Sequence, residues 1–191
     1  MINQSFSNMT GKILIATPFT MEGNVFHKSL IYVLRHAEEG TIGLIFNRPV
    51  KSAPANNLFN KANPNFDFNN HELNIHIGGP MEVERGFFLH SSDYDKNLLF
   101  NPRGGELAIS SNLQILEDII SGNGPKNSLF IVGYTGWGAG QLEFELENNL
   151  WIIAEPDSEL MFSTGENDKW TKALGLIGVS SNYFIPTVAT S

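Results

Sequence analysis

A glycine-rich stretch from Gly133 to Glu143 is the feature that most restricts how this chain can fold. Four glycines, at positions 133, 136, 138 and 140, surround a tyrosine and a tryptophan directly after the apolar run 129–132. Glycine permits positive φ angles and close backbone approach, at a cost in conformational entropy. So many glycines beside two large aromatic residues indicate a backbone that bends tightly around a ligand, a partner or the rest of the core.

The flanking residues give this stretch two interpretations. Residues 128–134 predict a strand, whereas residues 142–150 fit either a strand or a helix, and we expect the helix because Gln, Leu and Glu favour it. A strand, a glycine loop and a helix together can surround an anion with backbone N–H groups. The glycine spacing matches neither the dinucleotide-binding motif nor the P-loop. The stretch is therefore either a small-ligand site or a tight structural turn.

The length and charge of the chain limit the classes of function. The 191 residues predict a single domain over 1–191, with one sizeable core. The formal net charge is -8 and the isoelectric point is about 5.0. Affinity for nucleic acid comes largely from Lys and Arg that displace counterions, so this acidic balance argues against direct DNA binding. The absence of cysteine excludes disulfides and thiolate chemistry.

We expect neither a secretory signal at the N-terminal residues nor a membrane-spanning segment in this chain. Residues 1–8 lack both a basic start and an apolar segment, and we expect residues 1–11 to be flexible. No apolar run approaches the roughly 20 residues that span a bilayer. We therefore expect a cytoplasmic protein with no membrane association.

Most of the first half of the chain has the short, β-branched apolar runs of strands, separated by turn residues. Residues 51–72 differ, because seven asparagines and two prolines fall among them, and they predict a surface insertion with a short helix at 55–61. Residues 91–105 predict a loop. The expected strands are 12–17, a hairpin of 29–36 with 41–46, and 73–77 paired in a second hairpin with 83–90.

Helical patterns gather in the second half of the chain. Residues 112–121 place four apolar side chains on one face, with Ser111 as the expected N-cap and Gly122 as the C-terminal glycine. Residues 158–162 and 168–177 predict two more helices, after a strand at 150–154. Strands that come early and helices that come late favour an α+β fold.

Two arginines lie beside tight turns and are candidates for binding an anion. Arg48 follows a buried strand in Asn-Arg-Pro, and Arg85 follows Gly78-Gly79-Pro80 and two glutamates. A guanidinium can grip a carboxylate or phosphate through two hydrogen bonds. A structural ion pair between Arg85 and Glu82 or Glu84 is the competing interpretation.

The histidines are candidates for acid–base chemistry but not for metal binding. No two of them have the spacing of a local metal site, and we predict neither a metal nor a cofactor. His36 and His90 each end an apolar strand, where a structural role is usual. No catalytic residue is assigned. Gln141 and Glu143 adjoin the glycine stretch and are better placed for function than the glutamates that follow.

Ordered motifs from about residue 11 to 178 resemble the AlgH/YqgE family of bacterial proteins. They cover nearly the whole chain, so a chance match is excluded in practice. The motifs are Lys12-Ile-Leu-Ile-Ala-Thr-Pro18, Gly43-Leu-Ile-Phe-Asn-Arg-Pro49, Gly78-Gly-Pro80, Arg85-Gly-Phe-Phe-Leu-His90, the glycine-rich stretch, Asn149-x-Trp151 and Trp170-x-x-Ala173-Leu174.

The resemblance implies a fold but no activity. It implies a single α+β domain with a split, mostly antiparallel sheet, a small closed barrel and surrounding helices. The family name suggests transcriptional regulation, and no catalytic residues accompany it. Residues 180–191 lack the Gly-x-Ala ending that the resemblance leads us to expect, and the composition of residues 51–72 is also unusual for the family.

Two main hypotheses about function follow. The first is a non-enzymatic regulator that binds a small ligand or a protein partner. The second is a hydrolytic or phosphate-handling enzyme, with His90 or His36 as acid–base group and Arg85 as anion holder. Oligomeric state is not predicted. The candidate ligand-binding residues are Arg48, Arg85, His90, Gly136, Trp137, Gly138, Gln141 and Glu143.

Overall fold

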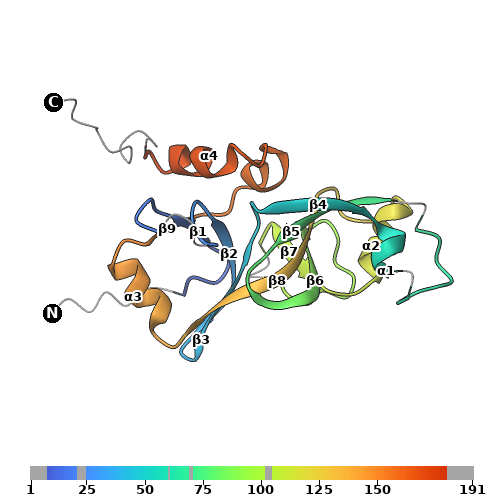
Figure 1. Cartoon of the computed structure of the whole chain (residues 1–191), viewed down its shortest axis with the longest axis horizontal. Helices are drawn as coiled ribbons and strands as arrows, with labels where there is room; N and C mark the ends of the chain where they lie inside the picture. Colours follow the sequence, from blue (N-terminus) through green and yellow to red (C-terminus); the bar gives the residue numbers. More distant parts are fainter. Residues whose placement is uncertain (1–7, 21–24, 60, 69–70, 102–104, 180–191) are drawn as a thin grey trace.

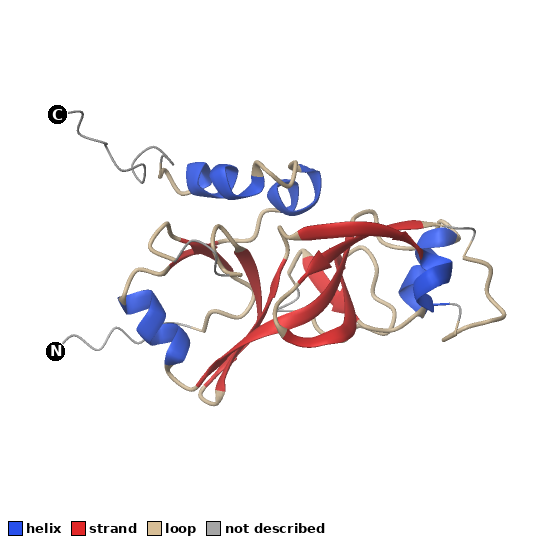
Figure 2. Ribbon diagram, viewed as in Figure 1, coloured by secondary structure: helices blue, strands red, loops and turns tan. Residues whose placement is uncertain are grey.

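A computed structural model describes residues 8–20, 25–59, 61–68, 71–101 and 105–179 of the protein. Its strands join in one mixed sheet with few and short helices around it, an α+β architecture as predicted (Figures 1 and 2). The strands are β1 (Ile13–Ala16), β2 (Leu30–Ala37), β3 (Gly40–Ile45), β4 (Pro49–Pro54), β5 (Glu72–Ile77), β6 (Met81–Ser91), β7 (Leu107–Ser110), β8 (Ser128–Gly138) and β9 (Trp151–Ala154). The helices are α1 (Ala55–Phe59), α2 (Gln114–Ile120), α3 (Gln141–Glu147) and α4 (Lys169–Leu176), with a π-helical turn η2 (Glu159–Ser163).

The long strand β8 belongs to two half-sheets and splits the sheet. Its first half runs between β5 and β6, and its second half, residues 135–138, pairs with β3. From β3 the sheet continues through β2 and β1 to β9, and from β5 it continues to β4. All of these pairings are antiparallel except that of β5 with β8. The described strands leave the sheet open, so the expected closed barrel is not found.

The two expected hairpins have different outcomes. β2 and β3 pair as an antiparallel hairpin, which confirms the first. β5 and β6 do not pair with each other because β8 lies between them, so the second is wrong. The link from β5 to β6 crosses the backbone of β8 closely. A Cβ on Gly78 would lie 2.3 Å from the Gly133 carbonyl oxygen, so the crossing requires glycine.

Two segments that the sequence analysis did not assign to strands contribute to the sheet and core. Residues 107–110 form β7, which pairs with β6 and was not predicted. The segment 51–72, expected as a surface insertion, supplies most of β4 and all of α1, and both Ala55 and Phe68 are fully buried. Of the expected flexible N-terminus, residues 1–7 lie outside the described residues, whereas Met9 is buried. The C-terminal residues 180–191 also lie outside them.

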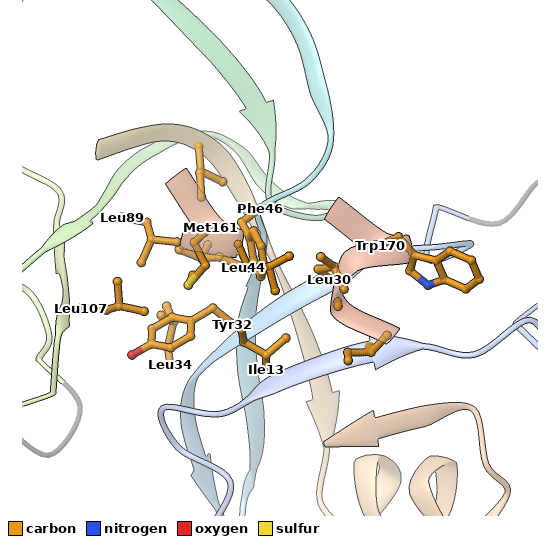
Figure 3. Close-up of a cluster of buried hydrophobic side chains, with 14 of the residues drawn as sticks. Ile13, Leu30, Tyr32, Leu34, Leu44, Phe46, Leu89, Leu107, Met161 and Trp170 are labelled. Carbon is orange, nitrogen blue, oxygen red and sulfur yellow. The ribbon is translucent and has the colours of Figure 1, made fainter. Parts of the chain in front are cut away.

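The main core lies between one face of the sheet and the C-terminal segment. Tyr32 on β2 and Phe46 just after β3 lie on this face, and Met161 of η2 and Trp170 of α4 pack against it (Figure 3). The Trp170 indole N–H donates to the Ala16 carbonyl oxygen at 2.8 Å, which fixes α4 to β1. The opposite face of the same strands packs against Leu142 of α3. Helices on both faces therefore hold β1 to β3 in place.

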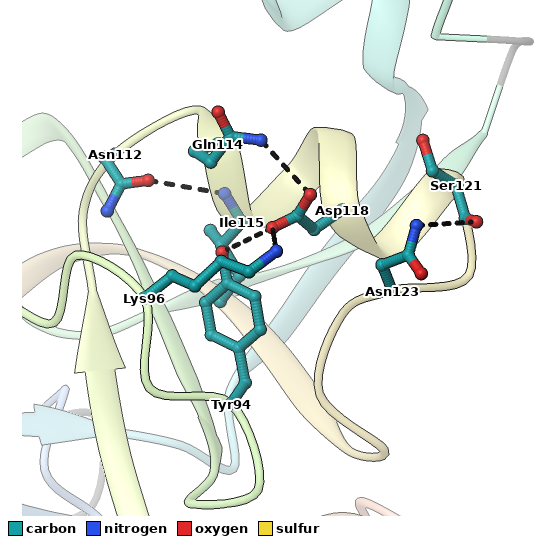
Figure 4. Close-up of polar contacts among 8 residues, drawn as sticks. All are labelled: Tyr94, Lys96, Asn112, Gln114, Ile115, Asp118, Ser121 and Asn123. Atoms are coloured by element: carbon teal, nitrogen blue, oxygen red, sulfur yellow. Dashed lines mark hydrogen bonds and ion pairs between the residues drawn. The ribbon is translucent and has the colours of Figure 1, made fainter.

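Helix α2 begins next to an asparagine rather than the expected serine. The Asn112 side-chain oxygen accepts a hydrogen bond from the Ile115 N–H at 3.3 Å, so Asn112, and not Ser111, satisfies a free donor of the first turn (Figure 4). Asp118 of the same helix ties it to a neighbouring loop. Its carboxylate accepts hydrogen bonds from Tyr94, Lys96 and Gln114.

Candidate functional site

The glycine-rich stretch is mainly a strand, not a loop. β8 continues through Gly138, and only residues 139 and 140 form the turn into α3. The predicted helix after the stretch is confirmed as α3, whose N-cap Gly140 has a φ of +73°. Gly133 has a φ of +71°, and a Cβ there would lie 2.7 Å from the Gly79 carbonyl oxygen. Gly133 therefore allows close packing against the neighbouring backbone, whereas the positive φ of Gly140 forms the turn into α3.

Trp137 lies in a buried group of aromatic residues that one carboxylate joins to α3. The indole N–H groups of Trp137 and Trp151 both donate to the same carboxylate oxygen of Glu145, at 2.8 and 2.7 Å. The two indole rings meet edge to face with centroids 5.9 Å apart. Glu145 therefore links β8, β9 and α3, a role that the sequence analysis did not assign to it.

Gln141 and Glu143 are used within the fold. The Gln141 side-chain oxygen accepts from the Gly138 N–H at 3.1 Å, and its amide donates to Glu145 at 2.9 Å. Glu143 lies 3.4 Å from Nε2 of His36. The other ring nitrogen of His36, Nδ1, lies 2.8 Å from the Thr41 hydroxyl. These contacts hold the start of α3 against β2 and β3.

Arg48 is half-buried against the turn before β2. Its guanidinium donates to the His27 carbonyl oxygen, and the same nitrogen lies 3.5 Å from the Ser29 hydroxyl. The Nε atom is buried with no hydrogen-bond partner among the described residues. Burial lowers the pKa of Arg48. These contacts join Arg48 to residues 27–29, and none of them involves another candidate residue.

Arg85 is exposed and forms the ion pair expected as the structural interpretation. Its guanidinium lies 3.2 Å from Glu82 and 5.1 Å from the centre of the Phe87 ring. The Tyr134 hydroxyl donates to the other oxygen of Glu82 at 2.9 Å. Hydrogen bonds from Tyr134 and then Arg85 lower the pKa of Glu82, and the bond to Glu82 raises that of Tyr134.

His90 is a buried structural residue. Its Nδ1 lies 2.9 Å from the Ser91 carbonyl oxygen and its Nε2 lies 3.0 Å from the Ser110 hydroxyl. A carbonyl can only accept, so Nδ1 carries the hydrogen and Nε2 accepts from Ser110. Burial lowers the pKa of His90, which favours this neutral form. His90 packs beside Tyr94, whereas Arg85 lies over Phe87, whose side chain belongs to the opposite face of β6.

Only part of the candidate set meets in one place. Gly136, Trp137 and Gly138 line a hollow of about 360 Å³ on the surface where β3, β6 and β8 meet. Arg85 lines an adjoining hollow of about 290 Å³. The two hollows share three lining residues, Arg35, Ile42 and Tyr134. Arg48 and His90 line neither of these two hollows.

A second polar group lies at another hollow, of about 650 Å³. His76 of β5 lines it, and its Nε2 lies 3.2 Å from Glu166, which also receives Lys169 at 2.7 Å. Sequence reasoning missed this group because Glu166 is 90 residues from His76 and no local spacing connects them. The one available signal was a histidine inside an apolar strand.

A metal-binding site and a membrane-spanning helix have no support in the described parts of the chain. No three His, Asp or Glu side chains there gather as ligands for a metal ion. No helix formed by these residues combines the length and apolar character needed to cross a lipid bilayer. The geometry thus defines an α+β protein with a split mixed sheet and two separate candidate surfaces.

Comparison with known proteins identifies the family. The chain belongs to the AlgH-like family, whose model matches residues 13–182. It is 50% identical over 184 residues to a UPF0301 protein of Rickettsia canadensis, covering 96% of each chain. It is 51% identical over 179 residues to a UPF0301 protein of Rickettsia akari, covering 94% of each. The resemblance drawn from the motifs is confirmed.

Solved structures share the fold. The solution structure of the AlgH protein from Pseudomonas aeruginosa matches with a TM-score of 0.75 and 30% identity, covering 100% of both chains. The crystal structure of protein DIP2367 from Corynebacterium diphtheriae matches with a TM-score of 0.67 and 23% identity, covering 88% of this chain and 86% of that one. The second likeness concerns the fold alone.

Proposed function

We propose that this protein is a non-enzymatic regulator that binds a protein partner through the surface formed by β3, β6 and β8. The observation that carries the proposal is a set of exposed apolar side chains around the two adjoining hollows. Ile42, Met81 and Leu99 are 38%, 44% and 46% exposed. Apolar patches on monomeric proteins commonly mark interaction sites. We call this surface the β3–β6–β8 face; its residues are Arg35, Ile42, Met81, Arg85, Leu99 and Tyr134.

The charges around the face suggest the chemistry of the partner. Arg35 and Arg85 flank its apolar centre, and each pairs at the surface with a glutamate close in sequence, Glu39 and Glu82. Exposed pairs of this kind contribute about 0–1 kcal/mol, so a partner's carboxylates can replace the glutamates at little cost. The face therefore suits a partner segment with apolar side chains between acidic residues.

The family name suggests transcriptional regulation. We propose that the protein affects transcription through its protein partner and does not bind DNA itself. The net charge of -8 supports this proposal, because a protein so acidic has little affinity for phosphate backbones. The cytoplasmic location expected from the sequence is part of the same proposal. A small ligand is the other kind of binding considered, and hollows of 290–360 Å³ lie at the lower end of the usual range for ligand pockets.

The enzymatic alternative lacks a supporting observation among the described residues. Acid–base catalysis requires the acid–base group and the anion holder to reach a common point. His90 is enclosed between Ser91 and Ser110, and Arg85 lies on the opposite face of its strand. His36 contacts Glu143 and Thr41 within the fold.

Site-specific photo-crosslinking in the native cells tests the proposal. A crosslinking amino acid replaces Ile42 in one sample and Leu176 in the control; Leu176 lies on α4 outside the face and is even more exposed, 56% against 38% for Ile42. We expect a protein enriched from position 42 and absent from position 176. Binding of that purified partner should then weaken at least about tenfold in Met81→Asp, because one charge in an apolar contact costs more than about 1.4 kcal/mol.

Two results would refute the proposal. One is crosslinking from Ile42 that yields no protein beyond those seen from Leu176. The other is a purified partner whose affinity is the same for the native chain, for Met81→Asp and for the matched surface variant Leu176→Asp. If small metabolites raise the melting temperature and Met81→Asp removes that effect, the face binds a ligand and not a protein.

A further inference from the structure

One of the two hollows on the β3–β6–β8 face combines an apolar wall with positive charge. This hollow has a volume of about 290 Å³, and its apolar wall consists of Leu34, Ile42, Phe87, Leu99 and Phe100. The charged residues that line it are Arg35 and Arg85, whose side chains are both exposed. Their glutamate partners, Glu39 and Glu82, do not line it. The hollow therefore suits an anionic group attached to an apolar body.

A carboxylate of the chain itself is already bound at the edge of this hollow. Oε1 of Glu82 accepts a hydrogen bond from the Tyr134 hydroxyl at 2.9 Å, and Oε2 accepts one from Arg85 at 3.2 Å. These bonds lower the pKa of Glu82, so the two donors favour the charged form of a carboxyl group. Tyr134 and Arg85 both line the hollow. They form a carboxylate-binding pair that Glu82 occupies in the free protein.

Glu82 is held there weakly. Its side chain is half-exposed, and exposed ion pairs of this kind contribute little stability. Its φ of +43° lies in the left-handed region, which is unfavourable for a residue with a side chain. It also lies where the pairing of β6 with β8 shifts register, between Met81 and Gly86. A carboxylate whose apolar body fills the hollow gains burial that Glu82 lacks, and can displace it.

The position of the carboxylate pair beside an apolar wall limits which part of a protein partner fits. An internal Asp or Glu has no apolar body of its own, and its apolar neighbours are attached to other residues. A C-terminal residue carries an apolar side chain and a carboxylate on the same Cα atom. A volume near the lower end of the range for ligand pockets suits one such residue.

This inference rests on the proposed function, and it names the part of the partner that is bound. We propose that the C-terminal residue of the partner occupies this hollow. Its large apolar side chain packs against the wall that includes Phe87 and Leu99, and its carboxylate takes the place of Glu82 at Tyr134 and Arg85. Arg35 supplies a second positive charge. Capture of a terminal carboxylate is a known mode of peptide recognition.

Three matched fragments test this chemistry on the full native chain. N-acetylphenylalanine has both the apolar side chain and the carboxylate, N-acetylphenylalaninamide lacks the carboxylate, and N-acetylglycine lacks the side chain. Titration of the ¹⁵N-labelled protein follows the backbone amides of β3, β6 and β8. We expect saturable binding of the first, with a Kd on the order of 1 mM. The other two should bind at least about fivefold more weakly, because one loses the charge-assisted hydrogen bonds and the other the apolar contact.

Two variants should change this binding in opposite directions. Arg85→Gln should weaken the binding of N-acetylphenylalanine at least about fivefold, because it removes a charged donor. Glu82→Ala should strengthen it about two- to fivefold, because it frees Tyr134 and Arg85. Lys172→Gln and Glu159→Ala are the controls for the change in net charge, since they remove the members of a surface ion pair outside the face. Both should bind the fragment as the native chain does.

The partner captured by crosslinking at Ile42 tests whether the bound group is a C-terminus. Adding Ser-Gly after its last residue moves the carboxylate away from the apolar side chain and should weaken binding at least about tenfold. If the extended partner binds as well as the original, the inference is wrong, whereas the proposed function stands.

Other results would also overturn the inference. One is equal binding of N-acetylphenylalanine and its amide, and another is unchanged binding in both Arg85→Gln and Glu82→Ala. Crosslinking that captures no protein refutes the proposed function and the inference with it. In that case, carboxylate-dependent binding of the fragments would assign the hollow to a free small acid.

Discussion

Replacing Glu145 with alanine should destabilise the protein markedly, although its side chain is only half-buried. The carboxylate accepts the indole N–H groups of Trp137 on β8 and Trp151 on β9, and its other oxygen accepts from Gln141. Both indole rings are buried. The substitution therefore leaves two buried donors without a partner.

The expected loss follows from the cost of each donor. A buried donor left unsatisfied costs about 1–3 kcal/mol, so two cost about 2–6 kcal/mol. Because Glu145 is half-buried, water can enter the space left by its side chain and accept hydrogen bonds from the indole N–H groups, which reduces the loss of stability. We expect a decrease of about 2–4 kcal/mol in the free energy of unfolding. For a domain of this size the melting temperature should fall by about 2–4 °C for each kcal/mol.

Urea unfolding followed by tryptophan fluorescence measures this directly. Glu147→Ala is the control, because Glu147 is exposed on the same helix and its loss should change the free energy by less than about 0.5 kcal/mol. Glu145→Gln keeps one acceptor and should fall between the two. If Glu145→Ala and Glu147→Ala have the same stability, the carboxylate does not hold the two tryptophans and the reasoning is wrong.

Three further substitutions test other parts of the structure. Gly79→Ala should cost more than about 3 kcal/mol, because φ is +153° and the added Cβ would lie 2.2 Å from the Tyr134 carbonyl oxygen. Gly122→Ala, with φ of +77° and no heavy atom within 4 Å of the Cβ, should cost only about 1–2 kcal/mol. Equal losses of unfolding free energy at the two glycines would show that the close contact is unimportant. Burial lowers the pKa of His90 from the ordinary 6.5, so the unfolded chain binds more protons just below pH 6.5 and stability falls as pH drops toward the folded pKa. The free energy of unfolding of His90→Gln should fall less over that pH interval than that of the native chain. An identical pH dependence in the two proteins would contradict the buried neutral form.

The sequence predicted most strands and helices because their apolar patterns are local. The alternation in residues 29–46 gave the β2–β3 hairpin, and the choice of a helix after residue 141 was correct. β7 was missed because Leu107–Ser110 is only four residues long and follows a polar segment. A strand this short is defined by its partner β6, which local pattern cannot reveal.

The part of the glycine-rich stretch after residue 134 was expected as a loop but continues as strand β8, and two of its glycines lie against distant parts of the chain. Gly133 lies against the Gly79 backbone, and Gly136 lies against the side chain of Met81. Spacing alone does not distinguish a loop around a ligand from a strand crossed closely by another segment. The grouping of His76 with Glu166 was hidden for the same reason, since only the folded chain brings residues 90 positions apart into contact.

The pairing of β1 with β9 has a consequence during synthesis. β1 ends at Ala16 and its outer partner begins at Trp151, so ribosomes add more than 130 residues before the partner exists. At about 5–20 residues per second this takes roughly 7–27 s. β2 can cover one edge of Ile13–Ala16 early, but the other edge of this wholly apolar strand stays unpaired. Nascent chains of this protein should therefore be substrates for ribosome-associated chaperones until residue 154 has emerged.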